Sequence, residues 1–213
     1  MATSRLELYN GALLHLKERK LSSLSEDREP RRVLDDVWDA RAQRYCLEQG
    51  LWNFATRSLL IDYSPSVEPS FGFRRAFDKP ADWVRTSAIS ADEYFRSVLL
   101  AEDYLDEAGY WWADLDQLYV RVVSDDASYG GDYSLWPETF TRWVECWLAW
   151  RAAPRIAATE IERLSKLTRK LLVDARSKDA QSEGTAFLPS GFWRRARAGR
   201  TGRDRGSRSR LIG

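Results

Sequence analysis

The sequence predicts a mainly α-helical protein: a four-helix bundle with a small antiparallel sheet and loop insertion and an extended C-terminal arm. Three observations lead to this prediction. Apolar residues recur at three- and four-residue steps in two stretches near the N-terminus and in two later stretches. Between them lie short aromatic and β-branched runs, separated by glycine and proline. Residues 184–213 show neither pattern, so we expect a folded body at 1–183 and a basic arm at 184–213.

Each helix has a start or stop signal. Ser4 and Glu7 form a capping-box pair, which satisfies free amides at a helix start. Pro30 suits a first helical turn, and Gly50 is expected to end that helix in the left-handed conformation. Pro154 is expected to end or kink the third helix. The four helices are expected at about residues 4–20, 30–49, 137–153 and 159–181.

The insertion is expected at about residues 57–133 and to be rich in strands. "RSLLIDY" reads as a short strand, and "EYFRSVLLAED" contains a strand-like aromatic and β-branched run. Residues 107–109 read as the turn between two strands, because they end in glycine. Alternation favours a half-buried strand around Leu118, Val120 and Val122.

Charge is divided unevenly along the chain, although the net charge is only +1. Residues 187–213 contain eight arginines and one aspartate, so this segment carries +7 and the remainder carries −6. Residues 91–138 hold twelve acids against two arginines, a net charge of −10. An acidic body with a basic arm indicates an arm that binds an acidic partner.

The ten tryptophans form an unusually large aromatic content. Most of them lie on apolar patterns, so core packing is the first interpretation. Trp111 and Trp112 are adjacent on an expected strand, so one ring should face inwards and the other outwards. A bundle of this size should leave some aromatic surface for partner subunits. We therefore expect Trp52 and Phe54 to be partly core and partly subunit interface.

The sequence offers no pattern for catalysis, and we predict no enzyme activity, catalytic residue, metal or cofactor. His15 is the only histidine, and Cys46 and Cys146 lie far apart and should be buried free thiols. Phosphate-loop, dinucleotide, nucleophile-elbow and zinc-protease motifs are missing. Adjacent carboxylates are numerous, but 32 acids produce such pairs by chance. No run of eighteen apolar residues occurs, so we expect no membrane association.

The arm combines apolar anchors with arginines. That combination fits a groove on a partner protein better than phosphate contact alone, although nucleic-acid binding and simple solubilisation remain open. The apolar anchors are Phe187, Leu188, Phe192 and Trp193, and the arginines expected to pair with acids of the partner are Arg194, Arg195 and Arg197.

Four stretches in this order resemble the head-to-tail adaptor (connector) proteins of tailed bacteriophages, of the tail tubular protein A type. They are "YNGALLHLKERKLSSLSEDREPRRVLDDVWD", "YCLEQGLWNFATR", "FRRAFDKPADWVR" and "SLWPETFTRWVECWLAWRAAPRI". With their spacing they cover roughly residues 5–180. Each alone is a packing motif with little specificity, and the ordered set is the more specific feature.

The resemblance implies a virion protein, made in the host cytoplasm, that forms a homo-oligomeric ring, commonly of twelve copies, at the head–tail interface. Such a ring binds the portal protein on one side and the tail nozzle or next tail component on the other. DNA passes through the bore without sequence-specific binding, and the C-terminal segment reaches into the portal. The alternatives are a nucleic-acid-binding protein that uses the arm and a tail-associated carbohydrate-binding module.

An anionic bore would let phosphates slide, whereas a cationic bore would hold them. Part of the acidic middle of the chain is therefore expected to face the lumen or the tail-side partner, with ordinary solvated loops as the alternative. The candidate residues are Asp103, Asp106, Glu107, Asp125 and Asp126.

Overall fold

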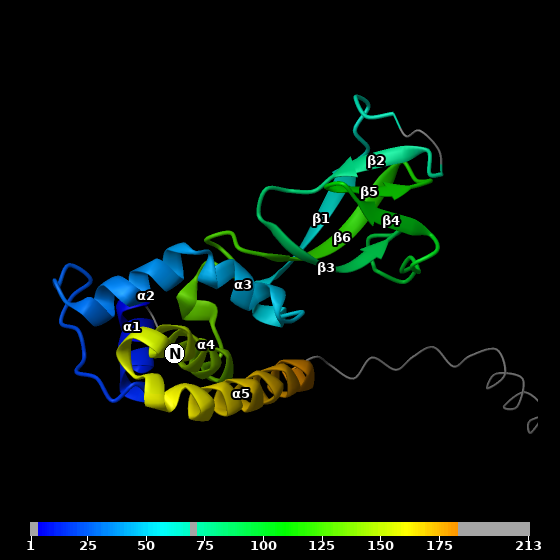
Figure 1. Ribbon diagram of the computed structural model, residues 1–213. Coiled ribbons are helices and arrows are strands. Elements are labelled where there is room, and N and C mark those ends of the chain that lie inside the picture. Colours follow the sequence, from blue (N-terminus) through cyan, green and yellow to red (C-terminus); the bar gives the residue numbers. More distant parts are fainter. Residues whose placement is uncertain (1–3, 69–71, 183–213) are drawn as a thin grey trace, which may run out of the picture. The chain divides into compact units, whose positions relative to one another are not determined.

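The computed structural model describes residues 4–68 and 72–182 of the 213-residue chain. The chain divides into two units, Met1–Ala180 and Gln181–Gly213, and nearly all of the second lies outside the described residues. Within the described part, the chain forms five α-helices and two three-stranded antiparallel sheets (Figure 1). The prediction of a four-helix bundle is therefore wrong, and the protein is a mixed α and β structure.

Helix α1 spans Arg5–His15, and its start follows the prediction. The Ser4 side chain accepts a hydrogen bond from the Glu7 amide at 3.4 Å. The helix ends earlier than expected because Lys17 adopts a left-handed backbone with φ of 61°. The Glu18 amide then donates to the Leu13 carbonyl at 3.0 Å, the backbone bond that closes a helix C-terminus.

The single helix expected at 30–49 is two helices, which raises the number of α-helices to five. Helix α2 spans Glu29–Asp39 and helix α3 spans Ala42–Glu48. The break lies at Arg41, which has a left-handed backbone with φ of 62°. Arginine favours helices, so the residue type gives no warning of this break.

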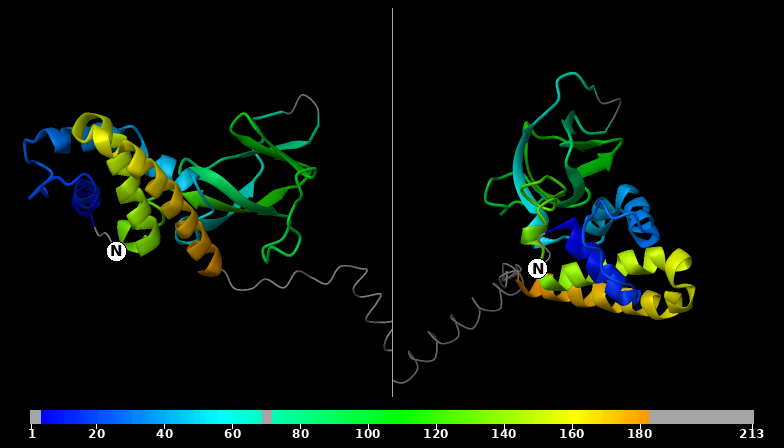
Figure 2. Two further views of the ribbon diagram at one scale, coloured as in Figure 1. Left: turned by 60° about the horizontal axis from the view of Figure 1, so that its bottom comes forward. Right: turned by 90° about the vertical axis from the view of Figure 1, so that its left-hand side faces the viewer.

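Helices α4 and α5 follow the strands. Helix α4 spans Glu138–Ile156 and contains Pro154, so the expected end at 153 is wrong. The last turn persists because the Ala157 amide donates to the Ala153 carbonyl at 2.8 Å. Helix α5 spans Ile161–Ser182 and runs beside α4 (Figure 2). The two helices meet where Cys146 Sγ lies 3.3 Å from Thr168 Oγ1.

Six strands form the two sheets, whereas one sheet was expected. The first sheet has the order β1-β6-β3, and the second has the order β2-β5-β4. The alternating residues expected on a strand lie on β6, and Ala108 and Gly109, with φ of 52° and 87°, form the expected turn between β4 and β5. The strands are β1 Thr56–Asp62, β2 Arg75–Asp78, β3 Trp83–Ser90, β4 Tyr104–Glu107, β5 Tyr110–Ala113 and β6 Gln117–Ser124.

The stretch "EYFRSVLLAED" is a loop rather than the expected strand. Strand β3 ends at Ser90, and only an isolated bridge joins Ser90 to Val98. The Asp92 carboxylate accepts hydrogen bonds from amides within the loop, so the backbone turns back instead of extending.

The core has two parts. The helical core is strongly aromatic, and Trp52 lies 4.7 Å from Phe140 and 6.2 Å from Trp143 between ring centroids. Gly50 has no positive φ, so its expected left-handed cap is wrong. Its role is steric, because a Cβ at this position would lie 2.7 Å from the Trp52 ring. The second core lies between the two sheets and centres on Phe77.

Strand β6 contributes to both cores. Leu118, Val120 and Val122 face the core between the sheets, whereas Val123 belongs to the helical core. Because neighbouring residues of a strand point to opposite faces, one strand can serve both. Val123 is paired with Thr56, the first residue of β1.

Candidate functional site

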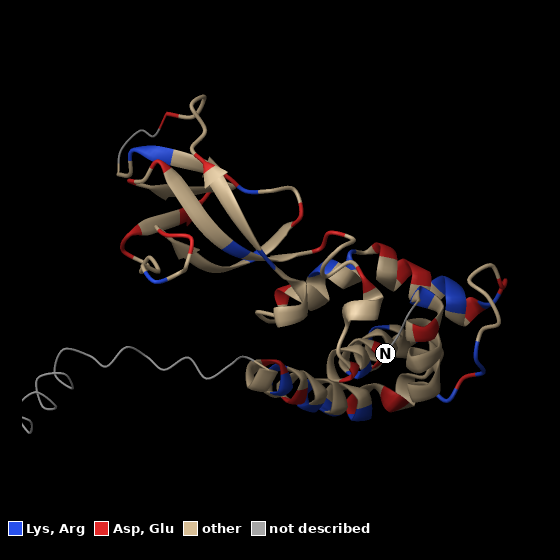
Figure 3. Cartoon of the chain, turned by 180° about the vertical axis from the view of Figure 1, so that it is seen from behind, with Lys and Arg blue, Asp and Glu red and all other residues tan. Residues whose placement is uncertain are grey.

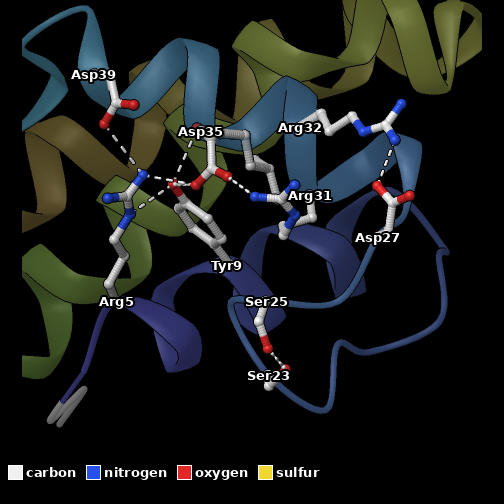
Figure 4. A network of polar contacts seen from close by, with 10 residues as sticks. Arg5, Tyr9, Ser23, Ser25, Asp27, Arg31, Arg32, Asp35 and Asp39 are labelled. Atoms are coloured by element: carbon white, nitrogen blue, oxygen red, sulfur yellow. Dashed lines mark hydrogen bonds and ion pairs between the residues drawn. The ribbon is translucent and has the colours of Figure 1, made fainter.

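A polar network joins α1 to α2 (Figure 4). The Tyr9 hydroxyl accepts a hydrogen bond from Arg5 Nε at 2.7 Å and donates to Asp35 at 2.9 Å. Asp35 also binds the guanidinium groups of Arg5 at 2.7 Å and Arg31 at 2.5 Å. Burial raises the pKa of the Tyr9 hydroxyl, the opposite of what a general base requires. The network therefore stabilises the packing of α1 against α2.

A second polar cluster lies where the first sheet meets α3. Arg57 binds Asp82 at 2.6 Å, and Ser124 donates a hydrogen bond to the same carboxylate. Nearby, Arg44 binds Asp125 at 3.1 Å and donates to a backbone carbonyl of β3. These side chains are at most about a third exposed, so the pairs fix the start of β1 and the end of β6.

The five acidic residues expected on one surface fall into two groups. Asp125 and Asp126 follow β6, where Asp125 is held by α3 and Asp126 accepts the Ser128 amide at 2.8 Å. That backbone hydrogen bond lowers the pKa of Asp126. The other three lie on or beside β4, in the second sheet.

Within the β4 group, the side chains differ in what they contact. Asp106 pairs with Lys79 at 2.5 Å, and Asp103 accepts the Leu100 amide at 2.9 Å. Glu107 is exposed next to the β4–β5 turn. The structure therefore brings Asp103, Asp106 and Glu107 to one region and keeps Asp125 and Asp126 apart from it.

A hollow of about 490 Å³ lies between the 91–103 loop and the end of β5. Its walls combine apolar and acidic side chains in one place. We name it the β hollow, and its lining includes Val98, Leu99, Glu102, Asp103, Asp114 and Leu115. Sequence patterns give no sign of the β hollow, because residues 91–103 and 114–115 are separate in the chain and the pairing of β4 with β5 brings them together.

The loop that forms one wall of the β hollow is held by Asp92. Its carboxylate accepts hydrogen bonds from the amides of Ser97 at 2.6 Å, Arg96 at 3.1 Å and Tyr94 at 3.2 Å. Burial acts to raise the pKa of Asp92, but these amides and the Ser90 hydroxyl outweigh it and lower the pKa to about 2. The loop is therefore built around an ionised carboxylate.

Glu145 is the titratable group with the opposite behaviour. It lies on α4 against α1, where a Cβ added to Gly11 would lie 2.1 Å from its Cδ atom. Burial, followed by the charge of Glu138, raises the pKa of Glu145 to about 7. The carboxyl group of Glu145 therefore binds a proton more readily than an ordinary glutamate does.

A hollow of about 470 Å³ lies at the break between α2 and α3. Arg41, Arg44 and Asp125 contribute charges of both signs to its lining. Arg44 and Asp125 are already paired with each other, and the charge of Arg41 is balanced by that of Asp39 in the same lining, so little net charge remains for a ligand.

The tryptophans are used in packing. Over residues 4–68 and 72–182, every tryptophan is buried or half-buried. Trp111 is fully buried and Trp112 half-buried, in agreement with the expected inward and outward rings. Trp52 is 1% exposed in this chain, so it is core, and Phe54 packs partly buried against it. A sugar platform of exposed tryptophans is thus not found in this part of the chain.

Cys46 and Cys146 are free and buried, as predicted. Burial, together with the charge of Arg163, lowers the pKa of His15, which is half-buried at the end of α1.

Among the described residues, no group of three or more His, Cys, Asp or Glu side chains is arranged to hold a metal ion. None of the described helices is both long enough and apolar enough to cross a membrane.

The residues expected to dock the arm, from Phe187 to Arg197, lie outside the described residues. Of the site residues predicted from the sequence, the structure therefore locates only the five acids. The β hollow is an additional feature that arises from the fold. Searches against family models and curated proteins find no match to this chain.

Proposed function

We propose that the protein is a structural connector of a tailed bacteriophage: a head-to-tail adaptor that joins the portal to the tail and lets DNA pass through a ring of copies. In this role it has no enzyme activity. Its C-terminal arm docks on the portal protein, and its opposite side receives the tail nozzle or the next tail component.

The observation that carries the proposal is how the four family-like stretches contact one another. Residues 45–57 bind residues 73–85 through Arg57 and Asp82, and they pack on residues 134–156 through Trp52 and Trp143. Residues 134–156 bind residues 9–39 through an ion pair of 2.7 Å between Arg155 and Glu29. The stretches that carry the resemblance therefore belong to one connected framework, and this supports the proposal.

Charge distribution supports the division of roles. Residues 187–213 carry +7, and apolar side chains precede the arginines. A basic, aromatic segment of this kind suits an acidic groove on a partner protein. In the proposal, Phe187, Leu188, Phe192 and Trp193 anchor the arm, and Arg194, Arg195 and Arg197 pair with portal acids.

The acidic surface is proposed to serve passing DNA or the tail-side partner. Asp106 and Asp125 are engaged in ion pairs, so reversing their charge would also disturb the fold. Glu107 is exposed at a turn and forms no ion pair within the described part of the chain, so Glu107→Lys is the cleaner variant. Slower DNA release from virions carrying it would support an anionic bore, and unchanged release would contradict this.

The decisive experiment mixes the purified protein with the portal protein of the same phage and weighs the complex by native mass spectrometry. A complex with about twelve copies per portal ring is expected, and a chain truncated at Gly184 should stay folded but fail to bind. If no complex forms while the full chain binds DNA tightly, in a salt-dependent and arm-dependent manner, the nucleic-acid-binding function replaces the adaptor.

A further inference from the structure

We propose that the β hollow of one copy receives helix α5 of a second copy, with Val173 as the central side chain, and that this contact links neighbouring copies. It deepens the proposed function and rests on it for the ring, because it names the surfaces through which the adaptor would assemble. The two surfaces are different, so the contact is head-to-tail rather than two-fold.

The β hollow has an apolar floor and an acidic rim. Leu99 and Leu115 are half-buried in it, and Val98 is 49% exposed. On the rim, Asp103 and Asp114 each accept a backbone amide, at 2.9 Å and 2.8 Å, which fixes their carboxylates in place.

Two further rim features set its charge. Glu102 forms no ion pair or hydrogen bond within the described part of the chain. Arg74 contacts Asp114 at 3.6 Å in an exposed ion pair, and no lysine or arginine is among the described residues that line the hollow. The rim therefore keeps a net negative charge available to a partner.

The complementary feature is on α5. Val173 is 63% exposed, although it is an aliphatic residue in the middle of a long helix. One turn before it lie Arg169 and Lys170, and one turn after it lies Arg176. Arg176 donates to the Gln49 carbonyl, whereas Arg169 and Lys170 are exposed and form no ion pair within the described residues.

The two features are complementary in polarity and in charge. An apolar side chain with basic residues one turn away on either side fits a hollow lined by apolar and acidic side chains, and the neighbouring Asp174 lies about 100° further round the helix. The hollow of about 490 Å³ has space for a valine with the aliphatic stems of its basic neighbours. The acidic loops and basic residues of α5 are both seen in Figure 3. Because surface and counter-surface differ, each copy can bind two neighbours, and repetition gives a ring when the rotation closes.

A cross-linking experiment with full-length chains tests the contact. One chain carries Val173→Cys, and a second chain, distinguished by a tag, carries Val98→Cys. Cys46 and Cys146 are buried, so a mild oxidant should act on the introduced thiols. A disulfide-linked heterodimer is expected. The control partner carries Leu14→Cys, because Leu14 is 68% exposed on α1. Equal linkage of Val173→Cys to both partners would overturn the proposal.

A charge exchange keeps the test independent of folding defects. Adding Lys170→Glu to the Val173→Cys chain should abolish the cross-link, since like charges would then meet. Adding Glu102→Lys to the Val98→Cys chain should restore it, because the charges are again opposite. Restoration cannot arise from a misfolded chain, and its failure with both chains folded by circular dichroism would also overturn the contact.

The outcome is separable from that of the portal experiment. A portal complex of about twelve copies without the 173–98 cross-link would keep the adaptor and reject this contact. The cross-link without a portal complex would keep the contact and reject the adaptor.

Discussion

The helical region and the strand region treat their large apolar side chains differently. In the helical region, Trp52, Phe140 and Trp143 pack against one another and are at most 1% exposed. In the strand region, one loop leaves Tyr94 69% exposed and Leu100 62% exposed. The first region packs its largest rings into its core, although it too leaves Leu14 68% and Val173 63% exposed, whereas the second gathers exposed apolar side chains in one loop.

The difference has a physical origin in size. Two three-stranded sheets enclose a small core around Phe77 and Trp111, so they have little interior left for a further loop. Apolar side chains that gather at a surface and are surrounded by charge usually contact a partner. The comparison thus separates a helical region that buries its largest rings from a strand region in which one loop keeps apolar side chains exposed.

The largest expected effect comes from the helical core. Trp52→Ala should lower the free energy of unfolding by about 3–5 kcal/mol, because it leaves a cavity among packed rings. Leu100→Ala, at a site 62% exposed, should change it by less than about 0.5 kcal/mol. Urea denaturation followed by circular dichroism measures both, and similar losses would remove the contrast between the regions.

A smaller effect is expected at the connection between the regions. Asp82→Ala removes the partner of Arg57 and Ser124, all at half-buried or buried positions, and should cost about 1–3 kcal/mol. The matched control is Asp116→Ala, whose carboxylate pairs with Arg75 at 2.6 Å but is 76% exposed. An exposed pair contributes at most about 1 kcal/mol. An equal loss of unfolding free energy in both variants would show that the Asp82 contacts stabilise the protein no more than an exposed ion pair does.

The helical region should respond to pH through Glu145. Its pKa is raised to about 7, so folding favours the protonated acid. The stability from this group is present below the ordinary pKa near 4.5 and is lost as pH rises through about 7. Glu145→Gln should remove that loss, which melting temperatures of both chains from pH 4 to 8 would reveal. Parallel pH profiles would contradict the assignment.

The strand region should respond in the opposite sense through Asp92. Its pKa is lowered to about 2, so its contribution is present above the ordinary value near 3.8 and is lost as pH falls towards 2. Asp92→Asn should loosen the loop wherever Asp92 is ionised, above about pH 2, since a neutral amide accepts hydrogen bonds from Ser97 and Arg96 less strongly. Hydrogen exchange of these two amides is the local measurement, and unchanged protection would refute the loop's dependence on this carboxylate.

Local features of the fold were predictable from the sequence at positions where the residue type strongly favours one conformation or one structural role. Alternation located β6, Gly109 marked a turn that requires positive φ, and Ser4 capped the first helix. Two errors came from residues whose tertiary role differs from their local preference. Arg41 breaks a helix although arginine favours helices, and Gly50 makes space for a ring instead of ending a helix.

The candidate site was less predictable than the fold. Its acids were visible in the sequence as a charge excess, but their grouping depends on which strands pair. Asp103 and Asp114 share the β hollow only because β4 and β5 form a hairpin, and Asp125 is separated from them because α3 holds it. Charge composition indicates that an acidic surface exists, whereas strand register decides where it is.

The pairing of Thr56 with Val123 makes the strand region an insertion whose two ends lie next to each other. The chain enters that region at β1 and leaves it at β6, and these two points are neighbours in one ladder. The helices therefore meet the insertion through a two-stranded neck whose ends are already held together. Loops beyond the neck, such as residues 91–103, can change length or sequence while the helices stay as they are. Exchange of such loops changes the surface that the strand region exposes while the helical core is kept.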